Sequence, residues 1–196
     1  MRVSREQSAR NRERILDAAA KLFKEHGFDG TGVDAVMKAA GLTHGGFYGH
    51  FASKDDLVAE VCERALARSL DRWSALAAAG GDAPVSAIAA HYLSAAHRDR
   101  PREGCLMAAL GPEVGRRGES VREAFTRGIR PLIDLLARVA PGGTEPAKRE
   151  AALRTLAGLV GAVVLARAVD DANLSDEILN ASAAPLSAAP APPHAR

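Results

Sequence analysis

Apolar residues along this chain recur mostly with the 3.6-residue period of an amphipathic helix, and strand-like alternation is hard to find. The first helix is predicted to end near His26, just before Gly27, because a glycine at that place is typical of a helix C-cap. Two short helices are predicted next, over about 31–40 and 43–50, with Thr31 as the N-cap of the earlier one. The apolar face of the first helix contains Ile15, Leu16, Ala19, Leu22 and Phe23.

Ser53 predicts the start of a long fourth helix, over about 54–78, because serine is a favoured N-cap. Five more helices are predicted at about 84–97, 103–113, 118–139, 147–169 and 174–182. Residues 182–196 contain six Ala and four Pro and no aromatic residue, which predicts a disordered tail. The pattern as a whole therefore predicts an all-α fold of about nine helices, with a compact three-helix unit followed by a larger helical bundle.

The aromatic residues gather near the N-terminus. Five of the eight lie within the first 51 residues: Phe23, Phe28, Phe47, Tyr48 and Phe51. A unit of about fifty residues has little area to bury, so large side chains are needed to fill its core. We expect the four phenylalanines there, whereas Tyr48 must point about 100° away from its neighbour, toward solvent or a phosphate.

Composition and charge exclude only a few classes of function. The net charge is +2, and residues 1–54 carry nine Lys/Arg against six Asp/Glu, a modest positive excess. Two cysteines are too few for a disulfide framework or a zinc module, and no catalytic motif is present, so no enzyme activity, cofactor or metal is predicted. The polar N-terminus and the longest apolar run, 155–166, fit neither a signal peptide nor a bilayer span of about 20 residues. We therefore predict a soluble, cytoplasmic protein without membrane association.

The two short helices around a glycine turn have the arrangement of a DNA-binding helix-turn-helix, over about 31–50. In that interpretation the exposed face of the second short helix enters the major groove, and neighbouring groups contact phosphates. The unpaired N–H groups at the start of the first short helix would favour an anion. The groove face carries Thr43, His44, Gly45 and Gly49, and the phosphate contacts are predicted from Thr31, Gly32, Tyr48, His50 and Lys54.

The segment from Arg14 to Leu57 resembles the DNA-binding domain of tetracycline-repressor-type (TetR-type) regulators. The matching features are ILDAAAKLF, the Gly-Phe-x-Gly-Thr link, the Ala-Ala-Gly-Leu turn, Phe-Tyr-x-His-Phe and Ser-Lys-Asp-x-Leu. The resemblance implies a domain over 8–68 and a dimer on a palindromic operator. It also implies groove or phosphate roles for Thr31, Gly32, Thr43, His44, Gly45, Tyr48, His50 and Lys54. His44 stands where the family often has lysine, and three glycines leave the recognition helix few side chains that reach bases.

Beyond that domain, the stretch Glu103–Val121 resembles one C-terminal subgroup of the same family, which implies an effector pocket and a dimer interface within 69–181. The candidate pocket residues are Trp73, Tyr92, Cys105, Met107 and Phe125, which a helical core could equally use. The helix near 151–169 is apolar almost all round, as a dimer-interface helix or an internal core helix would be. Its candidate interface residues are Leu156, Leu159, Val160, Val163 and Val164.

These observations lead to one main hypothesis and two alternatives. The main hypothesis is a homodimeric repressor that a small-molecule effector releases from its DNA operator. The first alternative keeps the DNA-binding unit but uses thiol chemistry at Cys105 for redox or electrophile sensing. The second is a helical interaction protein that does not bind DNA, which absence of salt-dependent DNA binding would favour.

Overall fold

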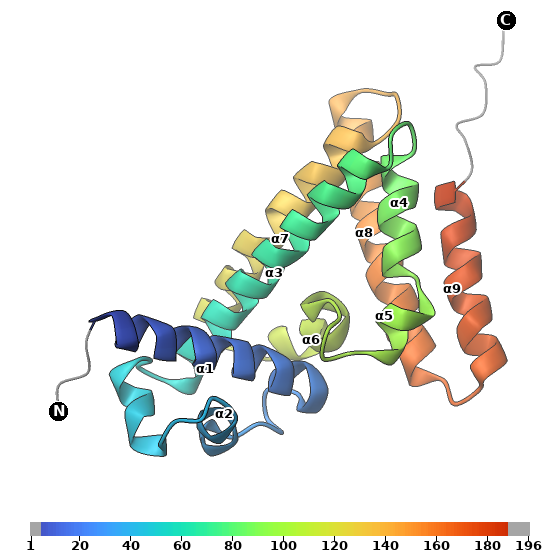
Figure 1. The fold of residues 1–196 in the computed structure, drawn as a ribbon. Coiled ribbons are helices and arrows are strands. Elements are labelled where there is room, and N and C mark those ends of the chain that lie inside the picture. The colour runs from blue at the N-terminus through green and yellow to red at the C-terminus, as the bar shows by residue number, and fades with distance from the viewer. Residues whose placement is uncertain (1–4, 188–196) are drawn as a thin grey trace, which may run out of the picture. The chain divides into compact units, whose positions relative to one another are not determined.

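A computed structural model describes residues 5–187, and all the regular structure within that range is helical (Figure 1). The prediction of an all-α fold is therefore confirmed. The region predicted as one helix over 84–97 is instead two, α4 and α5. The helices are α1 (Arg5–His26), α2 (Val33–Ala39), the 3-10 helix η1 (His44–Gly49), α3 (Lys54–Ala79), α4 (Pro84–Tyr92), α5 (Ala95–Asp99), α6 (Leu106–Val114), α7 (Glu119–Val139), α8 (Glu145–Ala168) and α9 (Ala172–Ser187).

The chain forms two compact units. The first contains the described residues up to Arg68 together with Arg100–Ile129, and the second contains Ser69–Asp99 and the described residues from Arg130 onward. Residues 100–129, which the sequence placed in a C-terminal domain over 69–181, thus belong to the same compact unit as the predicted helix-turn-helix. Helices α3 and α7 contribute residues to both units.

The predicted tail over 182–196 is only partly described, and the described part differs from the prediction. Residues 182–187 continue α9, whereas 188–196 lie outside the described residues. The prediction was wrong for 182–187 because contacts within the second unit outweigh the low helix propensity of Pro185. One such contact is the hydrogen bond that the Ser86 hydroxyl of α4 donates to the Leu186 carbonyl, at 2.5 Å.

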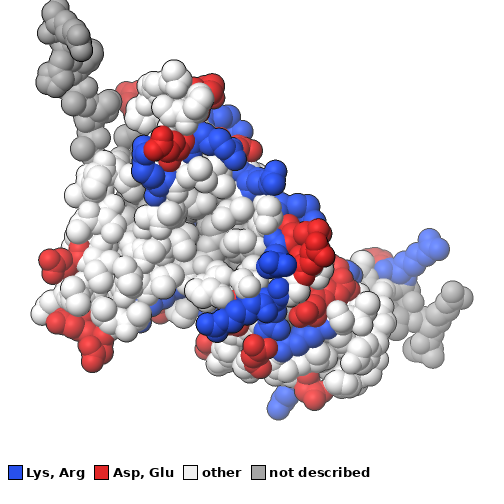
Figure 2. All heavy atoms as spheres, turned by 180° about the vertical axis from the view of Figure 1, so that it is seen from behind, with Lys and Arg blue, Asp and Glu red and all other residues white. Residues whose placement is uncertain are grey.

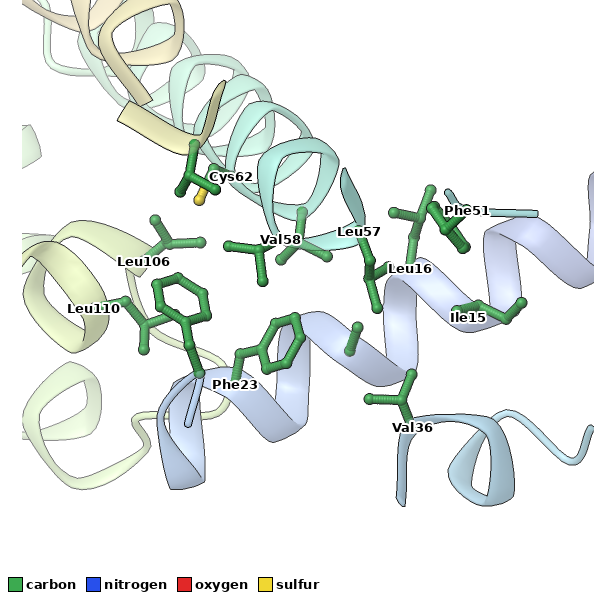
Figure 3. Close-up of a cluster of buried hydrophobic side chains, with 14 of the residues drawn as sticks. Ile15, Leu16, Phe23, Val36, Phe51, Leu57, Val58, Cys62, Leu106 and Leu110 are labelled. Atoms are coloured by element: carbon green, nitrogen blue, oxygen red, sulfur yellow. The ribbon is translucent and has the colours of Figure 1, made fainter. Parts of the chain in front are cut away.

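One hydrophobic core joins α1, α2, η1, α3 and α6 in the first unit (Figure 3). The four phenylalanines predicted for this core are all buried, at 0–2% exposure, which confirms that expectation. The rings of Phe23 and Phe28 meet edge to face at 5.3 Å, and those of Phe47 and Phe51 stack at 5.6 Å. Leu106 and Leu110 of α6 point into the same cluster (Figure 3), so α6 is part of the core that supports the helix-turn-helix.

In the second unit α8 packs against α9 and α4, and two arginines tie the helix ends together. Arg167 of α8 donates to the carbonyls of His97 and Arg98 at 2.6 and 3.0 Å. Arg98 in turn donates to the hydroxyl of Ser175 and to the carboxylate of Asp176, both on α9. Charge-assisted bonds of this kind are stronger than neutral ones, so they hold the short α5 against α8 and α9.

The exposed face of α8 differs from the one predicted to meet a partner. Leu156, Leu159 and Val163 are buried at 5%, 1% and 0% inside the second unit, so they cannot also form a partner-facing surface. That part of the interface prediction was wrong because a helix that is apolar all round gives no periodic signal for which face points outward. The outward face of α8 carries Leu153, Ala157, Val160, Gly161, Val164 and Leu165, all exposed or half-buried.

Helix α8 is also long and apolar enough to cross a membrane by length and composition alone, since 18 consecutive residues within it have a mean hydropathy of 1.6. Core helices of water-soluble proteins pass the same test. Figure 2 shows a broad area with few charged side chains on one face of the second unit. The apolar composition of α8 would be explained as well by a second helix packed on its outward face as by a membrane.

We predict that acid destabilises the second unit partly through His97. Burial lowers the pKa of His97 below its usual value near 6.5, since the cation loses its hydration, and the nearby Arg167 and His91 act in the same direction. The unfolded chain therefore binds a proton that the folded chain does not. Stability is fully present above the unfolded pKa and decreases as the pH falls through about 6.5, by at most about 1.4 kcal/mol per pH unit for one site.

The test is urea denaturation between pH 8 and pH 5. His97→Gln is expected to flatten the pH dependence of the free energy of unfolding, because it removes the buried imidazole. An equal slope for wild-type protein and His97→Gln would contradict the prediction.

Candidate nucleic-acid interface

Helix α2, a glycine turn and η1 form the helix-turn-helix predicted from the sequence. Gly41 closes α2 with a φ of +67°, a conformation that glycine adopts without strain. The N–H groups of Gly41 and Leu42 donate to the Lys38 and Met37 carbonyls at 3.0 and 2.9 Å, which ends α2 and redirects the chain. The guanidinium of Arg14 lies 2.6 Å from where a Cβ on Gly41 would stand, so a side chain there would also have to displace Arg14.

The recognition segment is a short 3-10 helix that tertiary packing holds in place. Phe47 is fully buried and anchors η1 to the core, whereas the next residue, Tyr48, is 68% exposed, as predicted. A Cβ on Gly45 or Gly49 would meet nothing within 4 Å, and Thr43 and His44 are exposed beside them. The outward face of η1 is therefore free to approach another molecule closely, backbone included.

The start of α2 differs from the predicted capping arrangement. Gly32, not Thr31, is the N-cap residue, and no side chain caps the helix there. The hydroxyl of Thr31 is instead buried and donates to the Gly27 carbonyl at 2.9 Å and the Leu22 carbonyl at 3.3 Å. The sequence could not distinguish the two roles, because a threonine hydroxyl can bond either the helix ahead or the one behind. Only the backbone of Thr31 and Gly32 is left to meet a phosphate, through the N–H groups of a helix N-terminus.

Lys54 begins α3 in a defined position. The Ser53 hydroxyl accepts a hydrogen bond from the Asp56 N–H at 3.0 Å, and the Asp56 carboxylate accepts one from the Ala52 N–H at 3.0 Å. This reciprocal capping fixes the first turn of α3, as Ser53 predicted. His50 and Lys54 are both half-buried, and His50 directly follows η1.

Two contacts at this surface have no counterpart in the sequence pattern. The His44 ring lies against the carboxylate of Asp34 on α2, so this exposed histidine has an acidic neighbour that is itself 82% exposed. Arg12 of α1 binds the carboxylate of Glu60 on α3 through both guanidinium nitrogens and lies 4.5 Å above the ring of Phe51. Pairs this far apart in the sequence leave no local signal, and Arg12 lies before the recognised motif.

The residues predicted to line an effector pocket fall in both units. Trp73 and Tyr92 are buried in the second unit with their rings edge to face at 5.5 Å. Cys105 and Met107 are buried in the first unit, where Phe125 packs against the hydrophobic core. Because these five residues divide between the two units, the effector pocket that they are predicted to line stays a prediction.

Cys62, the other cysteine, has an unreactive thiol. Burial raises the pKa of Cys62 to about 12, which keeps its thiol protonated near neutral pH. Among residues 5–187 no group of three metal-ligating side chains was found.

A helix-turn-helix with an exposed, glycine-rich second helix and a tyrosine beside it has the arrangement of a DNA-binding protein. Comparison with known proteins agrees. Residues 15–61 match the family described as "Bacterial regulatory proteins, tetR family". The HTH-type transcriptional repressor NemR of Escherichia coli strain K12 is 31% identical over 137 residues, covering 68% of this chain and 69% of NemR. AcrR of Shigella flexneri is 39% identical over 62 residues, which cover 32% of this chain and 29% of AcrR.

Solved structures show the same fold over most of the chain. E. coli NemR in its reduced form superposes with a TM-score of 0.74 and 26% identity, covering 90% of this chain and 95% of NemR. A TetR-family regulator from Agrobacterium tumefaciens gives a TM-score of 0.75 at 21% identity, covering 92% and 100%. The chain belongs to the TetR family of bacterial transcription regulators.

Proposed function

We propose that this protein is a repressor that binds a palindromic operator as a homodimer and releases it when a small molecule binds. The observation that carries the DNA contact is the exposed face of η1, with Tyr48 projecting from it and Gly45 and Gly49 open to close approach. His44 and Thr43 would face base edges, and Tyr48, His50, Lys54 and the N–H groups at 31–32 would contact phosphates. The related NemR is named a repressor, which supports the direction of control. As a transcription regulator, the protein would act in the cytoplasm.

The proposed dimer uses the outward face of α8. Val160 and Val164 remain candidates from the predicted interface, joined by Leu153 and Leu165, which are 46% and 57% exposed. A Cβ on Gly161 would meet nothing within 4 Å, so a second helix could approach α8 closely there. Two DNA-binding units about 34–36 Å apart would then meet successive major grooves on one side of the duplex.

The effector is proposed to act by shifting the population of dimers toward a spacing that does not fit the operator. The thiol alternative has one supporting observation. Cys105 is the N-cap residue of α6, so oxidation would place a larger polar group next to a helix of the first unit. Its exposure of only 8% counts against this alternative, because it limits the access of an oxidant to the thiol. Cys105→Ala separates the two, because a variant that still releases DNA normally with a small-molecule inducer excludes the thiol as the sensor.

The proposed function is tested by selecting duplexes from a random library with the wild-type protein and comparing them with the DNA upstream of its own gene. We expect an enriched inverted repeat, bound with an affinity that falls steeply with salt. Tyr48→Phe and Lys54→Gln should each weaken binding to all sequences, and His44→Ala should relax base preference. Absence of any enriched duplex would favour the helical interaction protein instead.

A further inference from the structure

We propose that Glu113 and Arg117, which lie outside the matched family segment 15–61, are positioning residues for DNA binding. They hold the loop from Gly27 to Gly32, whose last N–H groups face the phosphates, and the start of α3 at Lys54. The inference rests on the proposed DNA binding, because it concerns the geometry of that same surface. Both residues belong to the first compact unit, Glu113 on α6 and Arg117 in the turn after it.

Glu113 holds the backbone of the loop at Phe28. Its carboxylate accepts a hydrogen bond from the Phe28 N–H at 2.7 Å. The same carboxylate lies 2.6 Å from where a Cβ on Gly27 would stand, and Gly27 has a φ of +75°. The positive φ at Gly27 is a conformation that favours glycine, and the Glu113 carboxylate lies directly against this turn. Because the Phe28 ring is fully buried, both the backbone and the side chain of that residue are held.

Arg117 binds both ends of the DNA-facing segment. Its guanidinium donates to the Asp29 carboxylate at 2.6 Å and lies 3.7 Å from the Asp55 carboxylate. It also covers the ring of Phe28, with Cζ 5.2 Å from the ring centre. The Arg117 side chain is only 15% exposed, whereas Arg116 beside it lies on the surface. Nothing local in the sequence distinguishes Arg117 from Arg116.

These contacts affect DNA binding in two ways. A loop that is already ordered loses less conformational entropy when its N–H groups bind a phosphate. In addition, Arg117 neutralises Asp29 and Asp55, which lie three residues before Gly32 and directly after Lys54. Without Arg117 both carboxylates would repel the DNA backbone at the places where the protein contacts it. The contribution of Arg117 is therefore larger than that of an arginine free on the surface.

The experiment uses the full chain and a duplex enriched by the wild-type protein, with dissociation constants from fluorescence anisotropy at 150 mM salt. Arg117→Met keeps apolar cover over Phe28 and removes both ion pairs, and Arg116→Met is the matched control with the same loss of charge. Glu113→Ala removes the acceptor of the Phe28 N–H, and Glu113→Gln retains one. We expect Arg117→Met and Glu113→Ala to bind about tenfold more weakly. The Arg116→Met and Glu113→Gln variants should stay within about twofold of wild type.

Amide hydrogen exchange of residues 27–32 is the readout that a general loss of stability would not reproduce. In Arg117→Met and Glu113→Ala these amides should exchange faster while those of α8 are unchanged. If wild type binds the duplex and Arg117→Met binds it as tightly as Arg116→Met does, the inference is overturned while the proposed function stands. If wild type enriches no duplex, the proposed function fails, and the role of Glu113 and Arg117 in DNA binding fails with it. Amide exchange at 27–32 still reports whether these two residues hold the loop.

Discussion

Replacing Phe47 with alanine is expected to destabilise the DNA-binding unit by about 3–5 kcal/mol, the usual cost of truncating a fully buried phenylalanine. Phe47 is the single buried residue of η1, and its ring stacks on Phe51 at 5.6 Å. With three glycines, η1 has little helix propensity of its own, so nothing else in that segment compensates for the lost contact. Since domains are stable by only about 5–15 kcal/mol, the variant should lose most of its DNA binding at 37 °C.

Urea denaturation followed by far-UV circular dichroism measures this loss. For a slope near 2.5 kcal/mol/M, the midpoint should fall by roughly 1–2 M. Trp73, the sole tryptophan, lies in the second unit, so its fluorescence reports whether that unit unfolds at the same concentration. Tyr48→Ala is the matched control: the neighbouring ring is 68% exposed, so stability should change by less than about 0.5 kcal/mol while DNA affinity falls. A Phe47→Ala variant as stable as Tyr48→Ala would contradict the assigned core.

The parts of the fold that were predictable depend on neighbours in sequence. The period of Ile15, Leu16, Ala19 and Phe23 follows directly from the turn of a helix, and the structure buries all four. The contrast between Phe47 and Tyr48 follows from the rotation between consecutive helical residues, about 120° in the 3-10 helix η1 and 100° in the α-helix predicted there. The capping of α3 by Ser53 likewise involves groups only three residues apart.

What could not be predicted depends on pairs that are distant in sequence or on a choice between equivalent local partners. The hydrogen bond between the Glu113 carboxylate and the Phe28 N–H spans 85 residues, so no local pattern placed α6 in the DNA-binding unit. Thr31 could cap α2 or bond the end of α1, and only the packed structure decides. In α8 the apolar residues surround the helix, so Val163 was expected at a partner interface although it is completely buried. For Thr31 and Val163 the side-chain direction was unpredictable, and for α6 it was the elements that the helix packs against.

Replacing Gly161 with glutamate is expected to convert the proposed dimer into a monomer. A Cβ at this position meets nothing within 4 Å in the protomer, so the first atom of the new side chain makes no clash there. Glutamate also has a higher helix propensity than glycine, by roughly 0.5–1 kcal/mol, so α8 should not be weakened. In a symmetric dimer packed through this face, however, the two carboxylates would be buried near each other between close helices. Desolvation and repulsion of such a pair should cost several kcal/mol.

The mass in solution decides the question, by analytical ultracentrifugation at micromolar concentrations. Wild type should sediment at twice the 20.5 kDa of one protomer, and Gly161→Glu at the mass of one. Ala75→Glu adds the same charge to an exposed position of α3 and should remain dimeric. A monomer contacts only one half-site, so the affinity of Gly161→Glu for an inverted repeat should fall at least about a hundredfold, which is the usual gain from linking two binding sites. A dimeric Gly161→Glu with unchanged DNA affinity would instead place the partner on a face other than the outward side of α8.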